Sequence, residues 1–164
     1  MTIYIKNKHT LQIDDFKFRC CIGKNGFTKN KREGDKKTPT GTFGIENLYF
    51  RKDRKKKPST LIKCIEIKKN MGWCDDTRFP KKYNKLLEID TKIKHEKLKR
   101  GDHKYDFFIP IKYNFEKTVV GRGSCIFIHL TKDFKPTAGC IALKEKDFLI
   151  MLKLIKKNSK IKIN

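Results

Sequence analysis

Two residues near the end of the chain, Cys140 and His129, have side chains suited to covalent catalysis. The histidine ends the apolar run Ile126-Phe-Ile-His129, and the cysteine follows a glycine in Pro136-Thr-Ala-Gly-Cys140. A thiol is mostly protonated near neutrality, and an adjacent imidazole can take its proton when the sulfur attacks a carbonyl group. The parts for acyl transfer through a thioester are therefore present if the fold brings His129 to Cys140.

The backbone around the cysteine favours the same chemistry. Gly139 has no Cβ, so an acyl substrate can approach the thiol closely, and the N–H groups of Gly139 and Cys140 can hold the oxyanion that forms on attack. Buried free cysteines and histidines at strand ends are also common structural residues. Spacing alone leaves that second interpretation open.

Strands must position these residues, because most of the chain has strand-like patterning. Residues 105–113 and 124–130 are apolar nearly throughout, which predicts strands buried on both faces, and His129 lies at the end of the second. Alternating or β-rich composition predicts further strands at residues 2–5, 10–13, 16–22, 42–50, 60–67 and 159–164. The polar, glycine-containing residues 23–37 are expected to form a long loop.

One helix is predicted over residues 144–157, where apolar residues recur at i, i+3, i+4 and i+7: Phe148, Met151, Leu152 and Ile155. Residues 92–100 are expected to form a short second helix with Ile93 and Leu98 facing inward. Residues 71–76 are expected to break regular structure. The sum is a mainly β chain, and residues 1–164 are expected to form a single domain, since no repeat or low-complexity linker divides them.

The net charge of +23 is the most unusual feature of the composition. A basic surface attracts polyanions such as nucleic acid, anionic lipid or an acidic wall polymer. Only 7 of the 41 basic residues are Arg, and the lysines are scattered, whereas proteins that read phosphates or bases rely more on Arg. We therefore expect a compositional bias and no nucleic-acid partner, with a basic nucleic-acid-binding module as the alternative function.

The six cysteines include no C-x-x-C pair, and the four histidines are dispersed, so neither a metal site nor a disulfide framework is predicted. Besides Cys140 they are Cys20, Cys21, Cys64, Cys74 and Cys125. No run approaches the roughly 18–20 apolar residues that span a bilayer. The first residues also lack the apolar core of a signal peptide.

Four ordered blocks resemble the YkuD-type L,D-transpeptidase family. They are Gly34-Asp-Lys-Lys-Thr-Pro-Thr-Gly-Thr-Phe43, Gly72-Trp-Cys-Asp-Asp76, Asp102-His-Lys-Tyr-Asp106, and Gly121-Arg-Gly-Ser-Cys-Ile-Phe-Ile-His129, followed by Thr137-Ala-Gly-Cys140. Together they extend over roughly residues 20–164. Several ordered blocks are far more specific than a single Gly-Cys pair.

The resemblance implies a β-sandwich-like catalytic domain that acts on peptidoglycan stem peptides in the periplasm or cell envelope, without a cofactor. Cys140 would attack the third residue's carbonyl in a tetrapeptide stem and release D-alanine. His129 would act as general base and later acid, oriented by the backbone carbonyl of Ala138 or Gly139. The missing signal peptide leaves the cytoplasm as the alternative location.

Block position also marks six candidate substrate-contacting residues: Trp73, Asp75, Asp76, Tyr105, Arg122 and Thr137. Trp73 could equally be a core residue, since large aromatic side chains serve both purposes. The commoner family pattern reads Ser-His-Gly-Cys-aliphatic-Arg, and this sequence has Thr137, Ala138 and Ala142 in place of Ser, His and Arg. These departures leave both the acceptor and the precise donor undetermined. The alternatives are cross-linking, hydrolysis by an L,D-carboxypeptidase, or binding of wall peptide without turnover.

Overall fold

The computed structural model describes residues 1–164. Ten strands form one sheet in the order β6-β15-β1-β2-β3-β14-β13-β12-β7-β8. Their bounds are β1 (Thr2–Asn7), β2 (Thr10–Ile13), β3 (Phe16–Cys21), β6 (Gly41–Gly44), β7 (Leu48–Phe50), β8 (Cys64–Glu66), β12 (Phe107–Pro110), β13 (Phe127–Leu130), β14 (Ile141–Leu143) and β15 (Lys160–Ile163). The mainly β fold class predicted from the sequence is confirmed.

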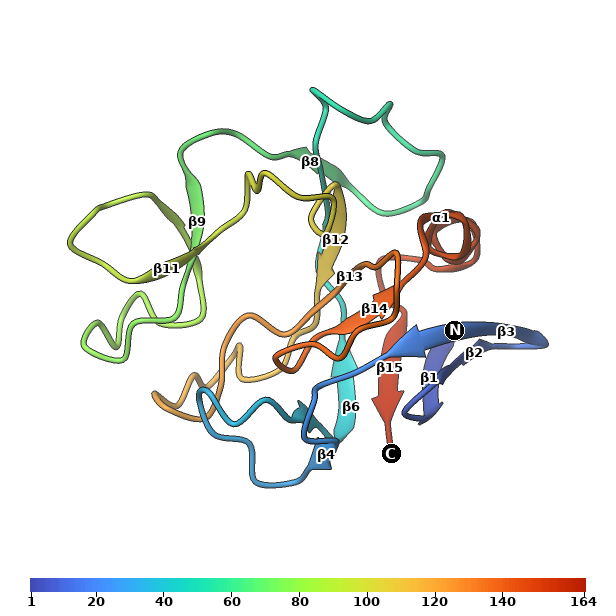
Figure 1. Ribbon diagram of the computed structural model, residues 1–164, viewed down its shortest axis with the longest axis horizontal. Helices are drawn as coiled ribbons and strands as arrows, with labels where there is room; N and C mark the ends of the chain where they lie inside the picture. The colour runs from blue at the N-terminus through green and yellow to red at the C-terminus, as the bar shows by residue number, and fades with distance from the viewer.

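Two smaller sheets and one helix complete the fold. The strands β9 (Met71–Cys74), β10 (Leu86–Glu88) and β11 (His95–Lys97) form a three-stranded sheet, and β4 (Phe27–Thr28) pairs with β5 (Thr38–Pro39). The helix α1 spans Glu145–Leu154. Figure 1 shows α1 and the three-stranded sheet on opposite sides of the central strands β12–β14.

The central strands are buried on both faces, as their apolar sequences predicted. On β13, Ile128 and Leu130 belong to a cluster of 25 buried residues that includes the apolar face of α1. Phe127 belongs instead to a cluster of 8 buried residues that also holds Tyr105 and Cys140. Successive side chains of a strand point to opposite faces, so one strand contributes to both clusters. We call them the aliphatic core and the aromatic cluster.

Helix α1 buries the face that its periodicity predicted, since Phe148, Met151, Leu152 and Ile155 are all fully buried. Acidic residues in its first turn and Lys153 in its last complement the helix dipole. The helix ends before the predicted residue 157, because Ile155 is extended.

The predicted second helix at residues 92–100 is wrong. Part of this segment is β11, which pairs antiparallel with β9, so the predicted break in regular structure at residues 71–76 is also wrong. Gly72 makes room for the His95 ring, because a Cβ there would lie 2.8 Å from Cδ2 of His95. Ile93 and Leu98 are buried as predicted, but against a sheet rather than in a helix. A long-range pairing thus outweighed a weak local pattern.

The other strand predictions are confirmed: β2 has the predicted bounds, β1 extends to Asn7, and the rest are shorter than predicted. Residues 42–50 divide into β6 and β7, and residues 60–67 contain only the three residues of β8. The predicted loop at residues 23–37 contains the two-residue strand β4.

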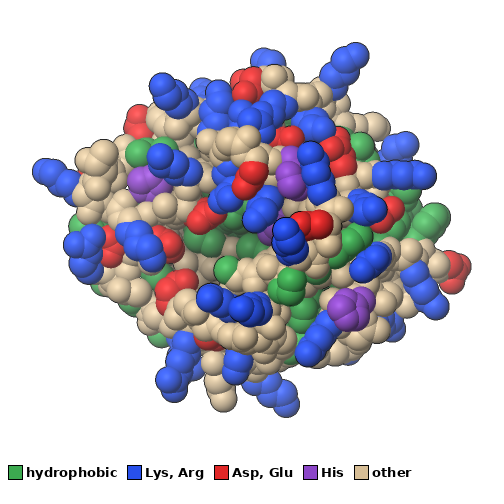
Figure 2. Space-filling model, viewed as in Figure 1, with side chains coloured by type: hydrophobic (Ala, Val, Ile, Leu, Met, Phe, Trp, Pro, Cys, Tyr) green, Lys and Arg blue, Asp and Glu red, His purple; other side chains and the backbone are tan.

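The surface carries its basic residues in a dispersed pattern. In Figure 2, Lys and Arg side chains are spread over the whole visible face with Asp and Glu between them, and hydrophobic side chains show in a hollow near the centre. All six cysteines are free thiols. The one helix is too short and too polar to cross a membrane.

Candidate active site

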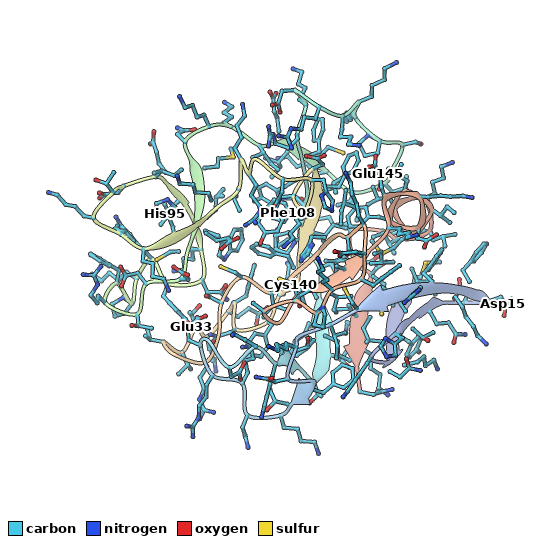
Figure 3. All side chains as sticks on the ribbon, viewed as in Figure 1. Asp15, Glu33, His95, Phe108, Cys140 and Glu145 are labelled. Atoms are coloured by element: carbon cyan, nitrogen blue, oxygen red, sulfur yellow. The ribbon has the colours of Figure 1, made fainter.

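The strands β13 and β14 bring Cys140 and His129 onto one face of the sheet. They pair in parallel, with His129 opposite Ala142 and Ile128 opposite Ile141. Cys140 directly precedes β14 and shares a face with Ala142, so it lies on the same side as His129, two residues along the pair. Cys140 lies near the middle of the molecule, between the sheet that carries His95 and the helix that carries Glu145 (Figure 3).

The Cys140 thiol is 9% exposed and held at two points. Its Sγ donates to the carbonyl oxygen of Cys125 at 3.1 Å and accepts a hydrogen bond from the Phe127 N–H at 3.4 Å. Burial raises the pKa of the Cys140 thiol to about 12, against the smaller lowering effect of the Phe127 N–H. The resting site therefore holds a neutral thiol.

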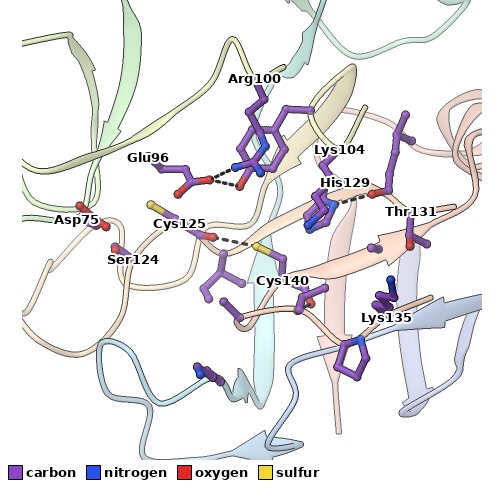
Figure 4. Close-up of a pocket in the computed structure, with 18 of the residues that line it drawn as sticks. Asp75, Glu96, Arg100, Lys104, Ser124, Cys125, His129, Thr131, Lys135 and Cys140 are labelled. Atoms are coloured by element: carbon purple, nitrogen blue, oxygen red, sulfur yellow. Dashed lines mark hydrogen bonds and ion pairs between the residues drawn. The ribbon is translucent and has the colours of Figure 1, made fainter. Parts of the chain in front are cut away.

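His129 is 6% exposed, and the structure fixes its tautomer. Its Nδ1 lies 2.9 Å from the carbonyl oxygen of Leu130, and a carbonyl only accepts, so Nδ1 carries the proton and the lone pair is on Nε2. Burial lowers the pKa of His129 to about 4. A neutral imidazole with a free Nε2 is the form that a general base requires. Figure 4 shows His129 and Cys140 in one pocket, with dashed lines for the bond from His129 to the Leu130 carbonyl and the bond from Cys140 to the Cys125 carbonyl.

The carbonyl that orients the imidazole is that of Leu130, whereas the family resemblance had implied that of Ala138 or Gly139. The Gly139 carbonyl is already engaged, because Thr38 Oγ1 donates to it at 2.8 Å. Thr38 is fully buried, and its Oγ1 also accepts from the Gly23 N–H at 2.9 Å. The Thr-Pro-x-Gly block thus holds the loop that carries the nucleophile.

Gly139 is required by its own backbone, a reason different from the one the sequence suggested. Its φ is +142°, and a Cβ there would lie 2.9 Å from the backbone oxygen of Lys37. Its N–H donates to Thr137 Oγ1 at 3.1 Å, and that hydroxyl donates to the Cys140 carbonyl at 2.6 Å. The N–H groups of Ala138 and Cys140 have no hydrogen-bond partner, so these two are free to bind an oxyanion.

Cys140 and His129 both open onto a cavity of about 590 Å³. Of the sequence-predicted residues, Asp75, Tyr105, Thr137 and Ala138 also line it. The sequence reasoning missed the charged residues of its wall, which include Lys31, Glu33, Lys36, Glu96, Arg100 and Lys104. Glu96 Oε1 accepts from the Tyr105 hydroxyl at 3.1 Å and from Arg100 at 2.7 Å.

Three of the predicted substrate-contacting residues lie outside the cavity. Trp73 is 3% exposed in the aromatic cluster, and its Nε1 donates to Asn84. Asp76 is buried and paired with Arg78, whose hydrogen bonds hold the pKa of that carboxyl well below its usual range. Arg122 is exposed, and its carbonyl accepts from the Tyr113 hydroxyl. Short sequence blocks place residues near a site but do not say which way each side chain faces.

Comparison with known proteins gives a family and one solved structure. The family model for the YkuD L,D-transpeptidase catalytic domain matches residues 1–163. "Structure of Bdellovibrio bacteriovorus Bd1075" is similar in fold, with a TM-score of 0.50 and 15% sequence identity. The likeness covers 99% of this chain and 47% of that one, so this chain spans about half of that protein's length. None of the curated proteins matches the chain.

Proposed function

The chain belongs to the YkuD family of L,D-transpeptidase catalytic domains, and we propose that it transfers acyl groups from peptidoglycan tetrapeptide stems through a thioester on Cys140. The supporting observation is that His129, on β13, and Cys140, directly before the parallel strand β14, line one cavity, with the His129 Nε2 free to take a proton. The substrate class follows from the family, so we also propose that the protein acts in the periplasm or cell envelope, with the cytoplasm as the alternative.

In the first step His129 transfers one proton, and the amide bond to D-alanine is replaced by a thioester bond to Cys140. Because the thiol and the imidazole are both neutral at rest, His129 takes the proton as Sγ attacks, rather than beforehand. The sulfur bonds to the carbonyl carbon of the third stem residue, and the bond from that carbon to the D-alanine nitrogen breaks. The proton passes from His129 to the departing amine, leaving a neutral imidazole and a thioester.

The tetrahedral intermediate carries a negative oxygen that needs donors. The free N–H groups of Ala138 and Cys140 supply them, one on each side of Gly139. Such backbone donors are already in place before the reaction, so they stabilise the developing charge without reorganising. The bond from Thr137 to the Cys140 carbonyl keeps this loop in shape.

The second step resolves the thioester. Attack by the side-chain amine of a neighbouring stem gives a cross-link, whereas attack by water gives a tripeptide stem. His129 removes a proton from either nucleophile. We propose cross-linking as the principal reaction and carboxypeptidase hydrolysis as its alternative on the same intermediate.

Intact-mass measurement tests the nucleophile. The wild-type protein is incubated with a tetrapeptide donor or a carbapenem, beside Cys140→Ala and the matched control Cys125→Ala, whose thiol lines the same cavity. We expect an acyl adduct on the wild type and on Cys125→Ala, and none on Cys140→Ala. An adduct on all three proteins, or on none, contradicts the assignment.

Product measurement separates the two fates of the thioester. D-alanine release and stem products are followed with and without an added amine-bearing stem. Cross-linked dimer that grows with acceptor concentration supports transpeptidation. If tripeptide is the sole product and its rate of formation does not depend on the acceptor, the principal reaction is hydrolysis and not transpeptidation.

A further inference from the structure

Lys31 is a buried lysine beside the nucleophile. It lies on the loop between β4 and β5 and is only 3% exposed, although lysine is rarely buried without a partner. Its Nζ donates to Asp35 Oδ1 at 2.5 Å and to the Arg32 carbonyl oxygen at 2.9 Å. These contacts fix the position of the ammonium group.

One glycine makes room for this side chain and a second lies in contact distance of it. A Cβ on Gly123 would lie 2.8 Å from the Cγ of Lys31, and a Cβ on Gly139 would lie 3.7 Å from its Cε. Gly139 directly precedes Cys140, and Gly123 lies two residues before Cys125, whose carbonyl binds the Cys140 thiol. The lysine stem therefore lies between the two segments that hold the sulfur.

Lys31 is part of the cavity wall, and its counter-ion is not. Lys31 lines the cavity with Cys140, whereas Asp35 is not part of the cavity wall. Asp35 also accepts hydrogen bonds from the N–H groups of Arg32 and Lys37, which hold it within its own loop.

Other titratable groups face Cys140 from the neighbouring elements: Glu96, Arg100, Tyr105, Cys125 and His129. The Glu96 charge opposes ionisation of the thiol, whereas Lys31 and Arg100 favour it. Arg100 is already paired with the carboxylates of Glu96 and Asp102. Lys31 is paired as well, but it lies against Gly139, next to the nucleophile, and its carboxylate partner Asp35 is outside the cavity wall.

We propose that Lys31 is a positioning residue for Cys140, a fixed positive charge that stabilises the sulfur as its proton leaves for His129. This inference rests on the proposed role of Cys140 as nucleophile. It makes the segment before Gly34 part of the catalytic machinery, with Asp35 as the anchor of its charge. The role is electrostatic and acts through the sulfur, so it does not depend on the identity of the acceptor.

Alkylation of Cys140 by iodoacetamide across pH 7 to 10, quantified by peptide mass spectrometry, tests the inference. Lys31→Met removes the charge and keeps a similar length. We expect it to slow Cys140 alkylation about tenfold or more at each pH below the thiol pKa, since a nearby charge shifts a pKa by one unit or more. The matched control Lys36→Met removes an exposed cation from the same cavity wall and should leave the rate within about twofold.

Conservative variants separate charge from loop structure. Lys31→Arg should recover most of the wild-type rate, and Lys31→Gln, which keeps a donor for Asp35 without the charge, should react as slowly as Lys31→Met. Should Lys31→Met fail to fold, Lys31→Gln carries the same comparison. Wild-type reactivity in the folded neutral variants, or equal slowing in Lys31→Arg, overturns the proposal. Alkylation is measured on Cys140 directly, so absence of acyl transfer to Cys140 is a separate result that bears on the proposed function.

Discussion

The two faces of the central strands differ in both composition and role. On one face, Ile128 and Leu130 pack with α1 in the aliphatic core, whose 25 buried residues are all hydrophobic. On the other face, Phe127, His129 and Cys140 lie among aromatic rings, and the His129 Nδ1 and the Cys140 thiol are each hydrogen-bonded to a backbone carbonyl. The same alternation of side chains along β13 and β14 therefore separates what stabilises the fold from what performs the chemistry.

The aromatic face depends on polar contacts because its functional groups are polar and buried. Asn84 is the centre of one such set: its Oδ1 accepts from Trp73 Nε1 and the Cys125 N–H, and its Nδ2 donates to two backbone carbonyls. Through Cys125 these bonds support the carbonyl that holds the nucleophile. The aliphatic face has no counterpart, so the two faces should respond to different perturbations.

The largest effect on stability is expected on the aliphatic face. Phe148→Ala removes a fully buried ring that stacks on Phe107 and should lower the free energy of unfolding by about 3–5 kcal/mol. Urea denaturation measures it. The matched control Phe16→Ala removes a ring that is 50% exposed and should cost less than about 1 kcal/mol. Alkylation of Cys140 in the folded Phe148→Ala protein should stay unchanged; a tenfold change would show that the two faces are coupled.

Acid should act on the opposite face, through His129. Burial lowers the pKa of His129 to about 4 from its usual 6.5, so the unfolded chain binds a proton in this range before the folded protein does. The free energy of unfolding is therefore unaffected by His129 protonation above pH 6.5. It falls by about 3 kcal/mol as the pH drops from there to about 4. The free energy of unfolding is measured against pH for the wild type and His129→Gln. Parallel curves for the two proteins contradict the prediction.

Asn84→Ala tests the polar contacts of the aromatic face. It leaves the Trp73 Nε1 and the Cys125 N–H without an acceptor, and such buried donors are costly, so the free energy of unfolding should fall by about 2 kcal/mol. Acyl-adduct formation on Cys140 should also slow, because the Cys125 carbonyl is no longer held. Asn70→Ala, which removes an exposed Asn bonded to Glu88, is the control and should change neither. Loss of stability with wild-type adduct formation would remove Asn84 from the support of the site.

The aliphatic face was largely predictable from the sequence. Alternating and continuous apolar runs gave most of the strands, and the spacing from Phe148 to Ile155 gave the buried face of α1, because those patterns are local. The three-stranded sheet was not predictable in the same way. Its strand β11 pairs with β9, and the His95 side chain lies over Gly72, so the sheet depends on contacts between distant parts of the chain.

The site was predictable only where the family motif carries it. Cys140 and His129 were identified, but the carbonyl that orients the imidazole belongs to Leu130, and a backbone carbonyl has no sequence signature. Lys31 and Glu96 come from a loop and from the three-stranded sheet, and only the fold brings them to one cavity. Position next to the Gly34 block was the one signal that could have drawn attention to Lys31.

The smallest effect tests how far the polar contacts of the aromatic face matter for chemistry. Tyr105→Phe removes the hydroxyl that donates to Glu96 but keeps the ring, whose centroid lies 5.5 Å from that of His129. The free energy of unfolding should fall by about 1 kcal/mol, the usual value of one such bond, and Tyr4→Phe, whose hydroxyl has no hydrogen bond, should cost nothing measurable. Acyl-adduct formation should change by less than about threefold, since the ring still packs against the imidazole. A tenfold loss would instead mean that the hydroxyl acts on the reacting groups, and the aromatic face would then contribute a side chain to catalysis beyond Cys140 and His129.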